Sequence, residues 1–136
     1  MNVPDQRVPA PLLAAVSLVA VESLLLVLFG LAELGWLSAD KATMGVTTSL
    51  FFVTYGAGLA LCAWELRRLR SWARAPVVLA QLLQLGVAWS FRGGTTTAVS
   101  AALAVVAVLV LTGVFHPASI RAVAGADEAD ENARTG

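Results

Sequence analysis

The sequence predicts an all-α integral membrane protein, built as a bundle of four transmembrane helices with both termini in the cytoplasm. Composition, four long apolar stretches and the placement of the basic residues support this prediction. The 136 residues are 58% hydrophobic and only 13% charged, whereas soluble globular domains are about 25% charged. Mean hydropathy is +0.79. A soluble domain of this length cannot enclose so much apolar surface, so we expect the chain to lie in a lipid bilayer.

Four apolar stretches are long enough to cross a bilayer, since a span takes about 20 residues. The third is the shortest and must stand nearly upright to reach across. Pro76 opens it at a first-turn position that tolerates proline, and Gly93-Gly94 provides a tight turn after it. The predicted spans are Pro11–Leu34, Thr47–Leu66, Pro76–Phe91 and Thr95–Phe115. They divide the chain into an N-terminal segment (1–10), a transmembrane domain (11–116) and a C-terminal tail (117–136).

The basic residues predict the orientation of the bundle in the cell membrane. Seven of them fall on one side of the predicted spans and two on the other. Because cytoplasmic loops carry the excess of Lys and Arg, we place the side with seven in the cytoplasm. The tryptophans support the same register, since all four fall at span ends, as in an interfacial belt. The seven are Arg7, Arg121, Arg134 and the arginine loop (Arg67, Arg68, Arg70 and Arg74), against Lys41 and Arg92.

The C-terminal tail is predicted to lack regular structure. His116-Pro117 should end or kink the last span, and the tail beyond it offers little apolar surface to bury. It carries a small acidic cluster of Asp127, Glu128, Asp130 and Glu131. Docking of this cluster onto the arginine loop is the alternative.

Polar residues within the spans are the candidates for function, because each is costly in lipid. Glu22 lies near the middle of the first span, and Glu33 follows eleven residues later on nearly the same helical face. Gln81 and Arg92 repeat this spacing in the third span, with Gln84 nearby. Spans one and three run in the same direction. If they are neighbours, Glu22 meets Gln81 or Gln84 in a polar seam, and Glu33 pairs with Arg92 as an outer ion pair.

The second span adds one polar group and a packing signal. Tyr55 lies at mid-depth, where it either donates to Glu22 or satisfies a backbone carbonyl. Gly56 and Ala60 form a small-xxx-small pair, a spacing that lets membrane helices approach closely. The single cysteine, Cys62, excludes an intramolecular disulfide and any multi-cysteine metal site.

Several classes of function are disfavoured. We find no nucleophile–base arrangement, phosphate-binding loop or metal-ligand spacing, so we expect no enzyme activity, no metal and no cofactor. The net charge of zero gives no reason to expect nucleic acid as a partner. The arginine loop fixes topology, and it is also suited to binding anionic lipid head groups, each arginine contributing about 1 kcal/mol near the surface.

One stretch carries a resemblance to known sequences. The segment Arg70-Ser71-Trp72-Ala73-Arg74-Ala75-Pro76-Val77-Val78 continues through Gln81-Leu82-Leu83. It resembles small four-span actinobacterial membrane proteins of uncharacterised function, in which a Trp-Ala-Arg-x-Pro segment leads into a Gln-containing third helix. The stretch from His116-Pro117 to Arg121 is similar to the end of their last helix. The resemblance covers about the second half of the chain and implies four spans, but no activity, cofactor or substrate.

These observations leave two functions open. The first is a non-enzymatic accessory or structural subunit that packs with a larger membrane assembly. The second is a small oligomeric transporter coupled to protons or cations, with Glu22 as its coupling carboxylate. Small multidrug exporters share the four-span architecture and a carboxylate in the first span, but the residues around Glu22 depart from their pattern. Glu22 itself is therefore a protonated packing residue, a proton- or cation-handling group, or a contact to a partner's helix.

Overall fold

The computed structural model describes residues 7–36 and 42–136, and within them the chain is helical with no strand. The predicted all-α class is thus confirmed. Residues 1–6 and 37–41, which include Lys41, lie outside the described residues. The helices are α1 (Ala10–Gly35), α2 (Ala42–Arg67), α3 (Arg74–Ser90), α4 (Thr97–Phe115) and α5 (Pro117–Thr135), with short 3-10 turns η2 (Ser71–Ala73) and η3 (Gly94–Thr96) before α3 and α4.

Among the described residues, three helical segments are long and apolar enough to cross a membrane. They are α1, α2 and the segment Gly94–Phe115, which consists of η3 and α4. α3 has 17 residues, about 26 Å at 1.5 Å per residue, and is shorter than the roughly 30 Å apolar core of a bilayer. A helix of this length reaches across only when it stands nearly upright or the bilayer thins around it.

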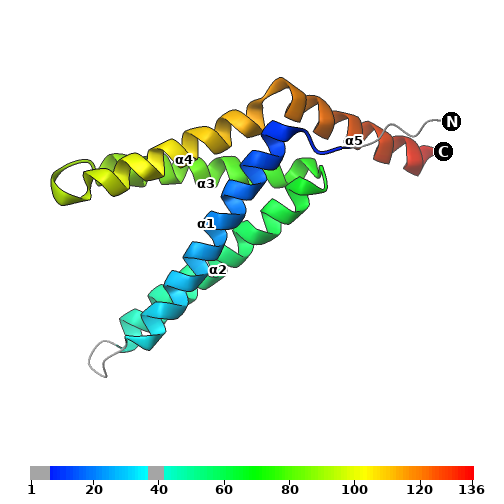
Figure 1. The fold of residues 1–136 in the computed structure, drawn as a ribbon. Helices are drawn as coiled ribbons and strands as arrows, with labels where there is room; N and C mark the ends of the chain where they lie inside the picture. Colours follow the sequence, from blue (N-terminus) through cyan, green and yellow to red (C-terminus); the bar gives the residue numbers. More distant parts are fainter. Residues whose placement is uncertain (1–6, 37–41) are drawn as a thin grey trace.

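The helices form two antiparallel hairpins that meet at one end and diverge toward the other (Figure 1). α1 packs along α2, and α3 packs along α4. The hairpins touch mainly through α1 and α4, with fewer contacts between α2 and α3. We call the meeting end the junction; α1 and α3 begin there, and α2 and α4 end there. Its fully buried apolar residues include Leu12, Leu66, Val77 and Val114, so the hydrophobic core sits at this end.

The α1–α2 hairpin is held together by small residues placed reciprocally on the two helices. Ser23 and Gly30 lie seven residues apart on α1, as do Ser49 and Gly56 on α2. Ser49 donates a hydrogen bond to the Gly30 carbonyl. A Cβ on Gly56 would lie only 2.9 Å from the Ser23 carbonyl oxygen, so the two backbones are nearly in contact. Gly56 is therefore a packing residue, whereas Ala60, its predicted small-residue partner, is exposed.

The C-terminal tail forms helix α5, where the sequence predicted no regular structure. The His116 side chain caps it by accepting a hydrogen bond from the Ala118 N–H (3.1 Å), and a proline at the first turn suits a helix start. Ser119 donates to the Gly113 carbonyl of α4 (2.6 Å), and Val123 is buried at 1% exposure. The alanine-rich sequence favours helix, and these anchors hold its first half against the junction.

We expect Val123→Asp to release α5. A carboxylate at this buried site would lose its hydration without gaining a partner, so the first half of α5 should detach. Amide hydrogen exchange should then be fast throughout 117–135 and unchanged in α1 to α4. Ala124→Asp places the same charge on the neighbouring exposed position and should leave α5 protected. Slow exchange in α5 of the Val123→Asp variant would show that this side chain is not the anchor.

A candidate polar site between the hairpins

Glu22 of α1 is hydrogen-bonded to two glutamines of α3. Gln81 donates through Nε2 to Glu22 Oε2 (2.8 Å), and Gln84 donates through Nε2 to Glu22 Oε1 (2.8 Å). The Gln84 amide also donates to the Leu103 carbonyl of α4 (3.0 Å). The structure thus brings together three of the residues that the sequence singled out. Their side chains link α1 to α3, and the Gln84 side chain also links α3 to the backbone of α4. We call Glu22, Gln81, Gln84 and Tyr55 the polar site.

The two glutamines differ in how well their polar atoms are satisfied. Their spacing of three residues places both on one side of α3. Gln81 is fully buried at 0% exposure, and its Oε1 has no hydrogen-bond partner among the described residues. Gln84 and Glu22 are half-buried. Buried polar atoms are almost always paired, and the Gln81 oxygen is an exception to this rule. It can therefore accept a hydrogen bond from another group.

The charge of Glu22 is not balanced within the described part of the chain. Both of its oxygens accept hydrogen bonds, an arrangement suited to the ionised carboxylate. The ion pairs found within residues 7–36 and 42–136 do not involve it. An unbalanced carboxylate in apolar surroundings is costly. A proton, a bound cation or a basic side chain from another molecule would each balance it.

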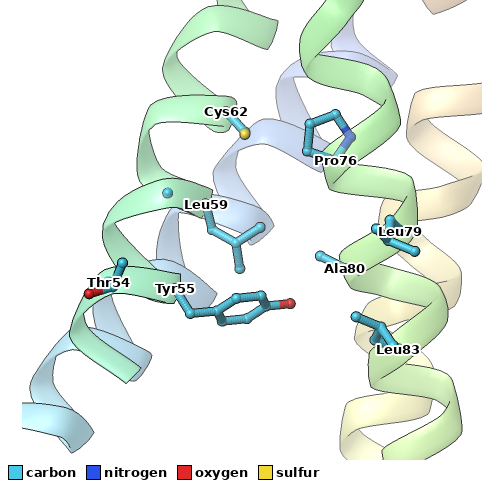
Figure 2. Close-up of a pocket in the computed structure, with 9 residues that line it drawn as sticks. Thr54, Tyr55, Leu59, Cys62, Pro76, Leu79, Ala80 and Leu83 are labelled. Carbon is cyan, nitrogen blue, oxygen red and sulfur yellow. The ribbon is translucent and has the colours of Figure 1, made fainter. Parts of the chain in front are cut away.

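Tyr55 of α2 lies beside this site and also lines a groove between α2 and α3. Its ring stacks on Phe51 at 5.8 Å, and Figure 2 shows its hydroxyl pointing toward α3. The hydroxyl lies within electrostatic range of Glu22, but no hydrogen bond joins it to any described residue, so neither of its two predicted contacts is present. The α2–α3 groove has a volume of about 340 Å³. Thr54 and Tyr55 are its polar residues, and the rest of its lining is apolar and includes Leu59, Cys62, Pro76, Ala80 and Leu83.

The predicted outer ion pair between Glu33 and Arg92 is absent. Glu33 lies near the free end of the α1–α2 hairpin, and Arg92 lies in the α3–α4 connection, so they occupy the tips of two different hairpins that diverge from the junction (Figure 1). The Arg92 guanidinium is instead 3.3 Å from the centre of the Trp89 ring. Both predicted contacts depended on the condition that the first and third spans are neighbours, whereas α1 packs mainly on α2 and α4. Hydrogen bonds from the long side chains of Gln81 and Gln84 to Glu22 join α1 and α3.

The arginine loop lies at the junction and has mixed surroundings. Leu69 ends α2 in a left-handed conformation (φ 61°) that glycine usually adopts, and it is buried. The four arginines therefore project from a loop whose backbone is fixed by the core. Three of them have a charged or aromatic neighbour: Arg70 lies 3.9 Å from Glu65, Arg68 5.7 Å from the Trp64 ring, and Arg74 6.0 Å from the Phe115 ring.

Comparison of the chain with protein-family models, curated proteins and solved structures finds no match. Within the described ranges, no group of three or more His, Cys, Asp or Glu side chains is placed to hold a metal ion. The polar site and the α2–α3 groove are the candidate functional features of the described residues.

Proposed function

We propose that this chain is a four-span protein of the cell membrane that acts as a non-enzymatic accessory subunit of a larger membrane assembly. The observation that carries this proposal is the Glu22 carboxylate, which is held by two amides and forms no ion pair with any basic side chain that the structure describes. It lies beside Tyr55 of the open α2–α3 groove. A membrane helix of another protein that fills the groove and brings a Lys or Arg to the depth of Glu22 would balance the charge.

The arrangement of the helix ends supports the proposed topology. Residues 7–9, the arginine loop and the start of α5 all lie at the junction end (Figure 1), so their basic residues share one side, which we assign to the cytoplasm. Trp36 and Trp89 are exposed near the free tips of the hairpins, and Trp64 and Trp72 are exposed near the junction. Exposed tryptophans at both ends suit the two membrane interfaces.

The divergence of the hairpins supports the need for a partner. Beyond the polar site, each hairpin is a pair of helices with large exposed apolar side chains, such as Phe29, Leu50 and Val99. Lipid covers such surfaces adequately, but it cannot pair with a carboxylate. Polar groups of neighbouring helices serve as specific contacts in membranes, so the polar site gives the groove selectivity for one kind of helix.

A site-specific photo-crosslink tests this proposal. The photoreactive residue p-benzoylphenylalanine replaces Leu83, which lines the groove, in a tagged chain expressed in its native membrane. We expect a crosslink to one larger membrane protein that also co-purifies stoichiometrically in mild detergent. The same replacement at Val108, which is exposed on α4 and lies outside the groove, is the matched control and should crosslink weakly. A homo-oligomer without a larger partner, or equal crosslinking at both positions, would contradict the proposal.

A small oligomeric carrier of protons or cations is the second candidate. The free Gln81 Oε1 and the Glu22 carboxylate are two acceptor groups on neighbouring side chains. On the proposed topology they lie near the middle of the membrane, where a site for a transported cation would need such acceptors. The purified chain alone, in proteoliposomes, should then show proton-coupled flux that Glu22→Gln abolishes while the fold persists. An accessory subunit shows no flux on its own, so this assay separates the two functions.

A further inference from the structure

A second groove opens beside the α2–α3 groove at the junction end of α3, and Leu79 lines both. It encloses about 430 Å³ and lies between α3 and the end of α4. Its polar residues, Arg74 and Ser71, come from the start of α3 and the turn before it. The rest of its lining is apolar and comprises Ala75, Val78, Leu79, Leu82 and Phe115. We call it the Arg74 groove.

Arg74 differs from its neighbours in the arginine loop. Arg70 lies 3.9 Å from the Glu65 carboxylate, and Arg68 lines a hollow that it shares with Asp127 and Asp130 of α5. Arg74 is half-buried over the Phe115 ring, with no acidic residue lining its groove and no ion pair to any described residue. Its guanidinium is a planar fork of N–H donors that suits a phosphate.

The apolar part of the groove runs along one face of α3. Ala75, Val78, Leu79 and Leu82 recur at spacings of three and four residues, so they form a continuous stripe of about 10 Å below Arg74. Leu79 and Leu82 are more than half exposed. On the proposed topology this stripe faces lipid, and Arg74 lies at the level of the head groups.

We propose that the Arg74 groove is a binding site for one anionic phospholipid. The phosphate lies against Arg74 and Ser71, and one acyl chain follows the stripe from Ala75 to Leu82. Charge complementarity selects the anionic head group, and a groove that faces the bilayer is filled by an acyl chain. The inference rests on the proposed four-span topology and is independent of the partner in the α2–α3 groove.

Native mass spectrometry of the detergent-purified chain tests the site. The protein is mixed with phosphatidylglycerol or with phosphatidylcholine of identical acyl chains, and the bound fractions are compared. We expect several-fold more phosphatidylglycerol to be retained, and Arg74→Gln to remove that preference. Arg67→Gln deletes the same charge elsewhere in the arginine loop and should keep it. An equal loss in both variants would mean diffuse attraction to the loop and would overturn the site.

A second pair of variants tests the groove without changing charge. Ala75→Phe fills the exposed mouth of the groove and should lower phosphatidylglycerol retention several-fold. Ala57→Phe adds the same ring to an exposed position on α2 and should not. Unchanged retention in Ala75→Phe would refute the acyl-chain path, even if Arg74→Gln failed to fold. The Leu83 crosslink, measured in the same Arg74→Gln chain, should persist, so loss of the lipid site is distinguishable from failure of the proposed function.

Discussion

Replacing Gly113 by valine should separate α1 from α4 and destabilise the whole junction. A Cβ at this position would lie 2.5 Å from the Pro11 carbonyl oxygen and 2.9 Å from the Ala15 Cβ, distances that no side chain can accommodate without moving the backbone. Overpacking a close contact costs about 1–3 kcal/mol and sometimes more. We expect the upper end, because the α1–α4 contact is the main link between the two hairpins.

Thermal unfolding in detergent measures this effect, with Gly86→Val as the matched control. A Cβ on Gly86 would meet nothing within 4 Å, and valine is at least as good a helix former as glycine, so this variant should be nearly neutral. Gly113→Val should lower the melting temperature clearly and increase hydrogen exchange in α5, since the Gly113 carbonyl accepts the Ser119 hydrogen bond. Equal stability of the two variants would show that α1 and α4 are not in close contact.

The sequence predicted the helices better than it predicted which helices pack together. Long apolar stretches and their flanking residues indicated where helices lie, although α2 begins at Ala42 rather than near Thr47. Pairing depends on a few small residues at close contacts, such as Gly30, Gly56 and Gly113. Eleven glycines occur in the chain, and no pattern in one sequence distinguishes these from glycines that face open space.

The polar residues illustrate the same limit. Helical periodicity placed Glu22 and Glu33 on one face of α1, and the conditional contact of Glu22 with Gln81 or Gln84 is present in the structure. It also placed Glu33 and Arg92 on matching faces of their helices. A helical face fixes only the direction in which a side chain leaves the helix axis, and it does not fix the distance to another helix. The angle between the hairpins decides what happens farther along the helices, and here they diverge beyond the polar site.

Helix α5 was missed for a different reason. Its second half is polar and exposed, a composition that indicates disorder when taken alone. The helix depends on Ser119 and Val123 near its start, and two buried residues in a polar tail are too weak a signal to recognise from the sequence.

The polar site should give a measurable coupling between Glu22 and Gln84. Glu22→Leu leaves the fully buried Gln81 amide without its acceptor, and a buried donor without a partner costs about 1–3 kcal/mol. Gln84→Leu removes a donor from both Glu22 and the Leu103 carbonyl. Because the two variants delete the same hydrogen bond, the double variant should be less destabilised than their sum, by about 0.5–3 kcal/mol.

Glu22→Gln is the informative comparison within this series. The new side chain keeps one oxygen as an acceptor, and its NH₂ group needs an acceptor in turn. Gln81 can supply one by turning its amide, because its Oε1 has no other partner. We therefore expect Glu22→Gln to cost much less than Glu22→Leu in the free energy of unfolding. If the two cost the same, the site requires the negative charge itself. That result would contradict a packing role for Glu22 and would leave a basic side chain of a partner or a bound cation as its counter-charge.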